Sequence, residues 1–154
     1  MDNRGAKPAS RAYWIGCSLG GLEGLIEARR FPDDYDGIVA GAPPNPLVKF
    51  NAAQLWPGWL LGRHRDVNMT KAKLEMVSKA ALKACATPIG LKQGFIDDPQ
   101  HCDFEPEQLQ CKGTETADCL TAGQVELMQQ LYRGPINPRT GEVIFPGVAK
   151  GNEN

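Results

Sequence analysis

The first third of the chain alternates short apolar runs with one amphipathic segment. Residues 12–15 form an apolar run, residues 19–26 carry leucine and isoleucine at helical spacing, and residues 37–42 lack charged and polar side chains. Pro32 ends the helical pattern, because proline cannot continue a helix. An all-apolar strand is typical of a parallel sheet that is covered on both faces. The pattern therefore predicts a strand, a helix of about three turns and a second strand, which form a βαβ unit.

The remaining two thirds of the chain predict helices with recognisable first turns. Thr70 can cap a helix over residues 71–84. Thr121 and Gln124, three residues apart, resemble a capping box that begins a helix ending at Tyr132. The apolar faces of both helices are explained by core packing and need no ligand.

Prolines mark the change between the two parts of the chain, over residues 43–49. We therefore expect an α/β fold class with two parts, residues 1–47 and residues 48–154. Near the end, a turn over residues 137–141 precedes a short apolar run, residues 143–145, which we interpret as the edge of a hairpin.

Composition excludes some classes of partner. The 17 Lys and Arg residues nearly balance the 18 Asp and Glu residues, and no basic stripe favours nucleic acid. No apolar run approaches the roughly 18 residues that a membrane span requires. The polar opening, residues 1–5, lacks the apolar core of a signal peptide, so we expect any export signal to lie upstream.

The cysteines favour an oxidising compartment. Four of the five lie between Cys85 and Cys119, in a region rich in turn formers. We therefore expect these four to form disulfides and not to be buried thiols. Four cysteines allow three pairings. A zinc site is the rival interpretation, but no CxxC pair occurs and His101 is the only nearby imidazole. Cys17 is the odd cysteine.

The strongest candidate for chemistry is the sequence GCSLGG at residues 16–21. A serine between glycines at a strand-to-helix turn is typical of a nucleophile elbow, where the flanking glycines avoid clashes around a strained central residue. Ser18 is then the nucleophile, and the backbone N–H of Leu19 supplies half of an oxyanion hole. Cys17 precedes the apex and is expected to point away from substrate. The alternative is an ordinary turn built from common turn residues.

Several motifs in order resemble the tannase and feruloyl esterase family, a secreted branch of the α/β-hydrolases. They are YWIGCSLGG, EARRFPDDYDGIVAGAPP, FNAAQLW, GFIDDPQHCDFEP, CLTAGQ and GPINPRTGEVIFPG, and they span residues 11–151. The resemblance implies a partial α/β-hydrolase core over residues 1–47, comprising strand, nucleophile elbow, helix and strand. It implies a mainly helical, disulfide-stapled partial lid domain over residues 48–154.

The resemblance also implies an activity, the hydrolysis of aromatic carboxylic esters through an acyl-enzyme on Ser18. The substrate is a small aromatic ester, and the full-length protein is secreted or periplasmic. The family's catalytic Asp and His have no counterpart in this chain, which we expect to be an internal piece of a longer protein. The alternative is an inactive truncated product, or a binding piece that needs the missing segments.

Disulfide partners follow from the same resemblance. It implies that Cys85 pairs with Cys102 and that Cys111 pairs with Cys119. Cys17 matches a cysteine that the family joins to another beside the catalytic histidine, so we expect its partner to lie outside this chain.

Two histidines leave a third hypothesis open, a small independent hydrolase. In it, His101 acts as base with Asp97 or Asp98, and a Cys17–Cys102 bridge brings His101 to Ser18. The resemblance instead makes His101 a surface residue of the lid. The flanking arginines explain the second histidine, His64, as part of a solvated helix end.

This chain departs most clearly from the family pattern at the calcium loop of the family's lid. The alignment puts Ala86, Ile89 and Gln93 where the family has three aspartates, and leaves only the backbone oxygens of Leu91 and Ile96. Calcium prefers about six to eight oxygens, with carboxylates supplying the charge. We therefore expect no calcium, no other metal and no cofactor.

Aromatic side chains follow the proline-rich boundary. Phe50, Trp56 and Trp59 either line an aromatic pocket beneath the lid or belong to the core.

Overall fold

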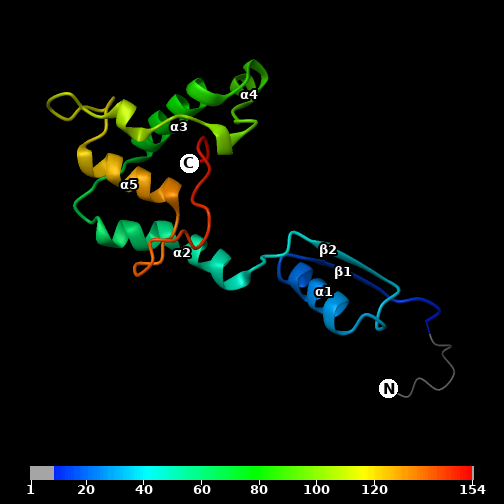
Figure 1. Cartoon of the computed structure of the whole chain (residues 1–154). Helices are drawn as coiled ribbons and strands as arrows, with labels where there is room; N and C mark the ends of the chain where they lie inside the picture. Colours follow the sequence, from blue (N-terminus) through cyan, green and yellow to red (C-terminus); the bar gives the residue numbers. More distant parts are fainter. Residues whose placement is uncertain (1–8, 154) are drawn as a thin grey trace. The chain divides into compact units, whose positions relative to one another are not determined.

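In the computed structural model, which describes residues 9–153, two parallel strands and one helix form the first of two units, Met1–Phe50 (Figure 1). Strand β1 (Tyr13–Cys17) pairs with β2 (Gly37–Gly41), and helix α1 (Leu19–Arg30) connects them. The predicted βαβ unit is confirmed.

Helix α1 covers one face of this sheet. Trp14 and Ile38 are register partners on that face, and a Cβ atom added at Gly24 of α1 would meet both side chains at 3.0–3.2 Å. The opposite face carries Tyr13, Ile15 and Val39, which are 63%, 79% and 59% exposed. The sequence predicts a sheet covered on both faces. Within residues 9–153, helix α1 covers one face and the other face is exposed.

The second unit, Asn51–Asn154, is mainly helical. The division falls after Phe50, three residues beyond the expected boundary, and lies inside helix α2. The elements that follow β2 are α2 (Leu47–Arg63), α3 (Lys71–Cys85), α4 (Pro88–Gln93), the 3₁₀ turns η1 (Pro99–His101) and η2 (Pro106–Leu109), and α5 (Ala122–Arg133).

The core of the second unit lies between α3, α5 and the loops that join them. Its buried members come from both helices and from the intervening segment: Val77, Ala81, Cys102, Phe104, Leu120, Val125 and Met128. Burial of these side chains supplies the main driving force for folding of this unit.

Local capping begins helices α3 and α5 as the sequence predicts. The Thr70 side chain accepts a hydrogen bond from the backbone N–H of Lys73. Thr121 and Gln124 form a reciprocal capping box at the start of α5. The predicted hairpin edge is present as an antiparallel bridge between Ile136 and Val143.

Two disulfides close the loops of the second unit. Cys85 bonds to Cys102 and Cys111 bonds to Cys119, the pairing that the resemblance implies.

Lys73 is buried, and its Nζ donates to Glu115 Oε1 at 2.6 Å, to the Cys119 carbonyl at 2.9 Å and to Gln124 Oε1 at 2.9 Å. This ammonium therefore joins α3 to the 111–119 loop and to the start of α5.

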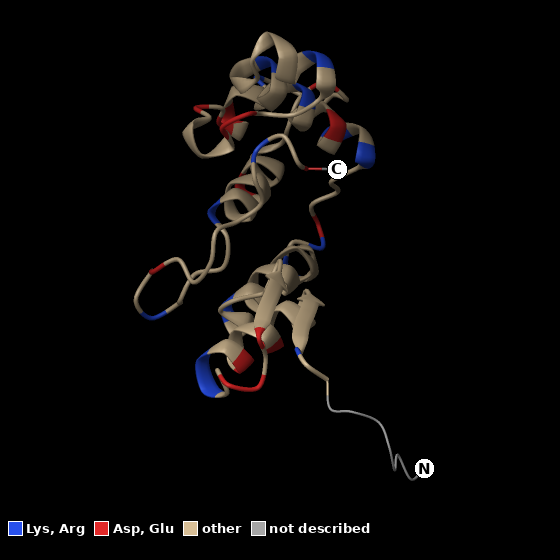
Figure 2. Cartoon of the chain, turned by 90° about the vertical axis from the view of Figure 1, so that its right-hand side faces the viewer, with Lys and Arg blue, Asp and Glu red and all other residues tan. Residues whose placement is uncertain are grey.

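Charges of both signs are interspersed along both units (Figure 2). Among residues 9–153, no helix combines the length and the apolar character needed to cross a bilayer.

Candidate active site

Ser18 occupies a strained turn between β1 and α1. Its backbone angles are φ 58° and ψ −121°, in a region that non-glycine residues rarely adopt. The residue is exposed, and its side chain makes no capping hydrogen bond to α1. This is the sharp strand-to-helix turn that the GxSxG spacing predicts. Strained backbone of this kind persists only where the surrounding structure holds it.

Hydrogen bonds from both strands hold the turn. The Ser18 N–H donates to the Gly41 carbonyl at 3.0 Å, which ties the elbow to the end of β2. The Trp14 indole donates to the Gly20 carbonyl at 2.9 Å from beneath α1. The Leu22 N–H donates to the Ser18 carbonyl at 3.0 Å and begins the helix.

Two glycines allow the close approach of backbone segments at the elbow. A Cβ atom at Gly16 would lie 2.3 Å from the Gly20 carbonyl oxygen, and one at Gly21 would lie 2.2 Å from the Gly41 carbonyl oxygen. A Cβ atom at Gly20 would meet nothing within 4 Å. The expectation that both glycines flanking Ser18 avoid a clash therefore holds for Gly16 and is wrong for Gly20.

The first turn of α1 presents unpaired N–H donors. Leu19, Gly20 and Gly21 follow Ser18, and no acceptor for their N–H groups lies among residues 9–153. The first N–H groups of a helix have no partner within the helix, and they carry the positive end of its dipole. This turn can therefore stabilise negative charge that develops beside Ser18.

Ala42 is a second strained residue, which sequence reasoning missed. Its φ is 41°, and it directly follows Gly41, the register partner of Cys17. Ser18 and Ala42 therefore both leave the sheet at the carboxyl ends of parallel strands, the edge where open α/β sheets bind ligands. No pattern in the sequence marked this strain in advance.

His101 contacts an aspartate in the second unit. Its Nδ1 lies 2.7 Å from Asp98 Oδ2, and both side chains are exposed. The hydrogen bond to His101 lowers the pKa of the Asp98 carboxyl below its ordinary value of 3.8. Cys102 is bonded to Cys85, and Cys17 is free and exposed. The structure therefore lacks the Cys17–Cys102 bridge on which the small independent hydrolase depends.

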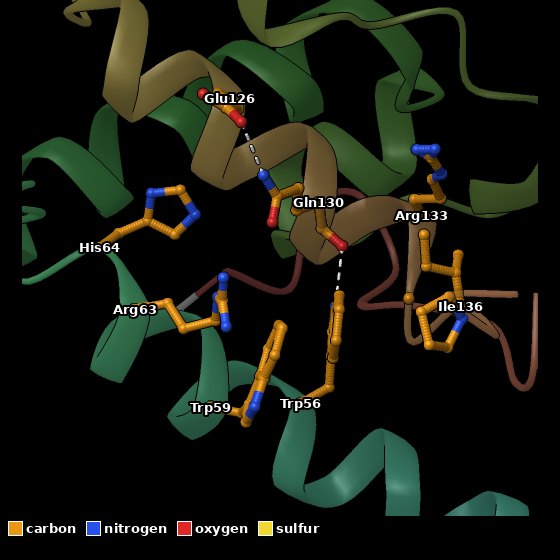
Figure 3. Close-up of a pocket in the computed structure, with 10 residues that line it drawn as sticks. Trp56, Trp59, Arg63, His64, Glu126, Gln130, Arg133 and Ile136 are labelled. Atoms are coloured by element: carbon orange, nitrogen blue, oxygen red, sulfur yellow. Dashed lines mark hydrogen bonds between the residues drawn. The ribbon is translucent and has the colours of Figure 1, made fainter. Parts of the chain in front are cut away.

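A pocket in the second unit contains two of the three boundary aromatics (Figure 3). Trp56 and Trp59 stack with ring centroids 4.8 Å apart, and the Trp56 indole donates to the Gln130 carbonyl at 2.9 Å. Trp59 is 51% exposed, so the pair lines a pocket and does not fill the core. His64 follows the end of α2, as expected, but is half-buried against this pocket.

The segment that aligns with the calcium loop does not fit calcium. Ala86, Ile89 and Gln93 provide no carboxylate there. Thr87 Oγ1 instead donates to Asp97 Oδ2 at 2.7 Å and accepts from the Gly90 N–H at 3.0 Å. Residues 88–93 form the short helix α4, which the sequence analysis did not predict. No cluster of three metal-ligating side chains occurs in the described part of the chain.

Comparisons with protein families and with known proteins agree on one family. The profile of the family described as "Tannase and feruloyl esterase" matches residues 1–154. An uncharacterised esterase of Xanthomonas campestris is 38% identical over 136 residues, which cover 88% of this chain and 24% of that protein. A mono(2-hydroxyethyl) terephthalate hydrolase of Piscinibacter sakaiensis is 35% identical over 153 residues, covering 85% of this chain and 25% of that protein.

Solved structures agree with the sequence relatives. The crystal structure of feruloyl esterase B from Aspergillus oryzae matches with a TM-score of 0.73 and 28% identity, over 94% of this chain and 29% of that chain. The chain thus spans about a quarter of the length of the curated relatives it matches. Its fold is a partial α/β-hydrolase core followed by a mainly helical, disulfide-bonded region. The chain belongs to the tannase and feruloyl esterase family.

Proposed function

We propose that this chain carries the nucleophile of a carboxylic ester hydrolase, and that Ser18 is that nucleophile. The observation that carries the proposal is the exposed, strained Ser18 at the N-terminus of α1, with its hydroxyl free of capping bonds. The matching family and relatives named as esterases support the activity.

The proposed reaction has two steps. The Ser18 hydroxyl attacks the ester carbonyl carbon as a general base takes its proton, and the alcohol leaves with a proton returned by that base. The N–H of Leu19 donates to the carbonyl oxygen while it carries negative charge. Water then attacks the acyl-enzyme, which releases the carboxylic acid and restores the serine.

The general base in this proposal is neither of the two histidines in the chain. The family resemblance puts the catalytic histidine beside a cysteine that bonds to Cys17. The cysteine beside His101 is bonded to Cys85, and His64 lines the tryptophan pocket. We therefore assign the base and its orienting aspartate to segments of the whole protein other than residues 9–153.

Aromatic acid esters are the proposed substrates. Relatives named as feruloyl esterases and as a mono(2-hydroxyethyl) terephthalate hydrolase support this class, since both names describe esters of aromatic acids. Two disulfides support a secreted or periplasmic location, because disulfides persist in oxidising compartments. We propose neither a calcium ion nor another cofactor for the reaction.

Labelling with a fluorophosphonate tests the nucleophile directly. We expect the probe to modify Ser18 in the complete hydrolase and S18A to abolish labelling. Hydrolysis of an aryl ester should follow the same order. Undiminished labelling of S18A would contradict the assignment.

A second candidate function follows from the open face of the sheet. Tyr13, Ile15 and Val39 expose apolar surface that α1 does not cover. A chain in this form would act as a binding piece that becomes active only with further hydrolase segments. Ser18-dependent labelling of this chain by itself would contradict this candidate, because the serine would then be reactive without those segments.

A further inference from the structure

The tryptophan pocket of the second unit has the size of a small-ligand site. Its volume is about 550 Å³, and residues of α2, α5 and the segment after α5 line it. Figure 3 shows the indoles of Trp56 and Trp59 at one side and the side chains of Gln130 and Glu126 across from them. All lining residues belong to the second unit, so the pocket needs no residue of the elbow.

Arg63 is placed to bind an anion at one end of the pocket. Its guanidinium carbon lies 4.9 Å from the centre of the Trp59 ring, a cation–π contact. A cation–π contact uses none of the N–H donors of the guanidinium group, which can therefore bind a planar, two-oxygen acceptor. The aromatic ring also restricts the side chain, which lowers the entropy cost of binding.

Neither arginine of the pocket has an acidic partner. Among residues 9–153, no carboxylate lies within ion-pair distance of Arg63 or Arg133, whereas Lys73 and Lys150 are each paired with a glutamate. Arg133 lies on the opposite side of Gln130 from Arg63 (Figure 3). Glu126 is the only acid in the described part of the chain that lines the pocket, so the two guanidinium groups leave an excess of positive charge.

Existing hydrogen bonds hold the polar wall in place. Gln130 Nε2 donates to Glu126 Oε1 at 3.0 Å, and the Gln130 carbonyl accepts from the Trp56 indole at 2.9 Å. These bonds occupy the acidic side chain and fix the ring of Trp56 against α5. The pocket therefore presents aromatic edges, the apolar side chain of Ile136 and unpaired guanidinium donors.

We propose that this pocket binds an aromatic carboxylate, with its ring against the indole pair and Ile136 and its carboxylate on Arg63. The ligand class follows from the pocket itself and does not depend on esterase activity at Ser18. It is the class of acid that the proposed esterase reaction releases, so the pocket would give the second unit a means of holding product or a related acid.

Calorimetric titration of the whole chain with trans-cinnamate tests this site. Arg63 and Arg65 form a matched pair, because both are exposed near the end of α2 and Arg65 does not line the pocket. We expect R63Q to weaken cinnamate binding about tenfold, the effect of losing a charge-assisted hydrogen bond of about 1.4 kcal/mol. R65Q should leave the affinity unchanged. Neutral cinnamamide should bind the wild-type chain more weakly than cinnamate, and R63Q should not affect it.

Two further variants separate this site from the elbow and from simple misfolding. S18A should leave cinnamate binding unchanged, because none of residues 9–50 lines the pocket. W59L should weaken both cinnamate and cinnamamide, and its circular dichroism establishes whether it is folded; if it is not, the R63Q and R65Q pair decides alone. Equal affinities of R63Q and R65Q, loss of binding in S18A, or no binding to the wild-type chain would each overturn the proposal.

Discussion

Thr87 and Asp97 form a direct hydrogen bond, with the Thr87 hydroxyl donating to Asp97 Oδ2 at 2.7 Å. The bond crosses the loop that the Cys85–Cys102 disulfide closes. A Cβ atom at Gly90 would lie 2.7 Å from the same carboxylate oxygen, so the Asp97 side chain packs directly against the backbone of α4. The contact between Thr87 and Asp97 thus organises the segment that aligns with the family's calcium loop.

Loss of the Thr87 hydroxyl is expected to destabilise this loop. T87V removes both the donor to Asp97 and the helix cap that accepts from Gly90 N–H, and should lower the free energy of unfolding by about 1–2 kcal/mol. T87S keeps the hydroxyl and is the matched control. Urea unfolding followed by circular dichroism measures both, and equal losses in T87V and T87S would contradict this role of the hydroxyl.

Calcium is expected to have no effect on the stability of this chain. Ala86, Ile89 and Gln93 supply no charge for the ion, so neither added calcium nor a chelator should shift the melting temperature. The triple variant A86D/I89D/Q93D restores three carboxylates and should gain a calcium-dependent rise in melting temperature. A shift in the wild-type chain would show that other oxygens bind the ion.

Gly16 and Gly20 should respond oppositely to alanine. G16A places a Cβ atom 2.3 Å from the Gly20 carbonyl oxygen, and this overpacking should cost about 1–3 kcal/mol. G20A meets nothing within 4 Å and should be neutral or add up to about 1 kcal/mol, because alanine favours the helix. Hydrogen exchange of peptides covering residues 13–41 reports on this unit. Faster exchange in G20A than in G16A would contradict the geometry of the elbow.

The stability of the second unit should depend on pH through Glu115. The hydrogen bond from Lys73, with the charge of its ammonium, lowers the pKa of the Glu115 carboxyl below its ordinary 4.5. A carboxyl with a lower pKa in the folded state contributes stability above its unfolded pKa, and this contribution is lost as the pH falls through the folded pKa.

E115Q should therefore be less stable than the wild-type chain at neutral pH, and the difference should shrink as the pH falls below about 4.5. Melting temperatures between about pH 3 and pH 7 measure the effect. E75Q is the control, because Glu75 faces the exposed Lys71 at 3.9 Å and not a buried ammonium. A constant difference between E115Q and the wild-type chain across this range would rule out the linkage.

Thiol titration should find one free cysteine. Cys17 is exposed, and the other four cysteines are paired as Cys85–Cys102 and Cys111–Cys119. A chromogenic disulfide reagent should detect one thiol in the native chain, none in C17S, and five after reduction in denaturant. Peptide mapping should place the two bridges as in the structure. Recovery of a Cys17–Cys102 peptide would revive the small independent hydrolase.

Local sequence signals located most of the elements correctly. The caps at Thr70 and Thr121 predict the starts of α3 and α5, because a cap is a contact between residues three apart. The bounds of helix α2 were not predicted. Helix α4 also escaped prediction, since its six residues are too few for a clear period. The role given to Gly20 was wrong because the motif specifies where glycines occur but not which of them another segment of the chain approaches closely.

By itself, the sequence determined the βαβ order, helices α3 and α5, the position of Ser18 at a strand-to-helix turn and the family, since these depend on neighbours in the chain and on ordered motifs. Only the tertiary structure decided the contacts between distant residues. Examples are the bond from Ser18 to Gly41 and the bond from Trp56 to Gln130, 74 residues apart. Such contacts depend on how the strands align and how the helices pack across a whole unit. No local pattern in the sequence therefore predicts them.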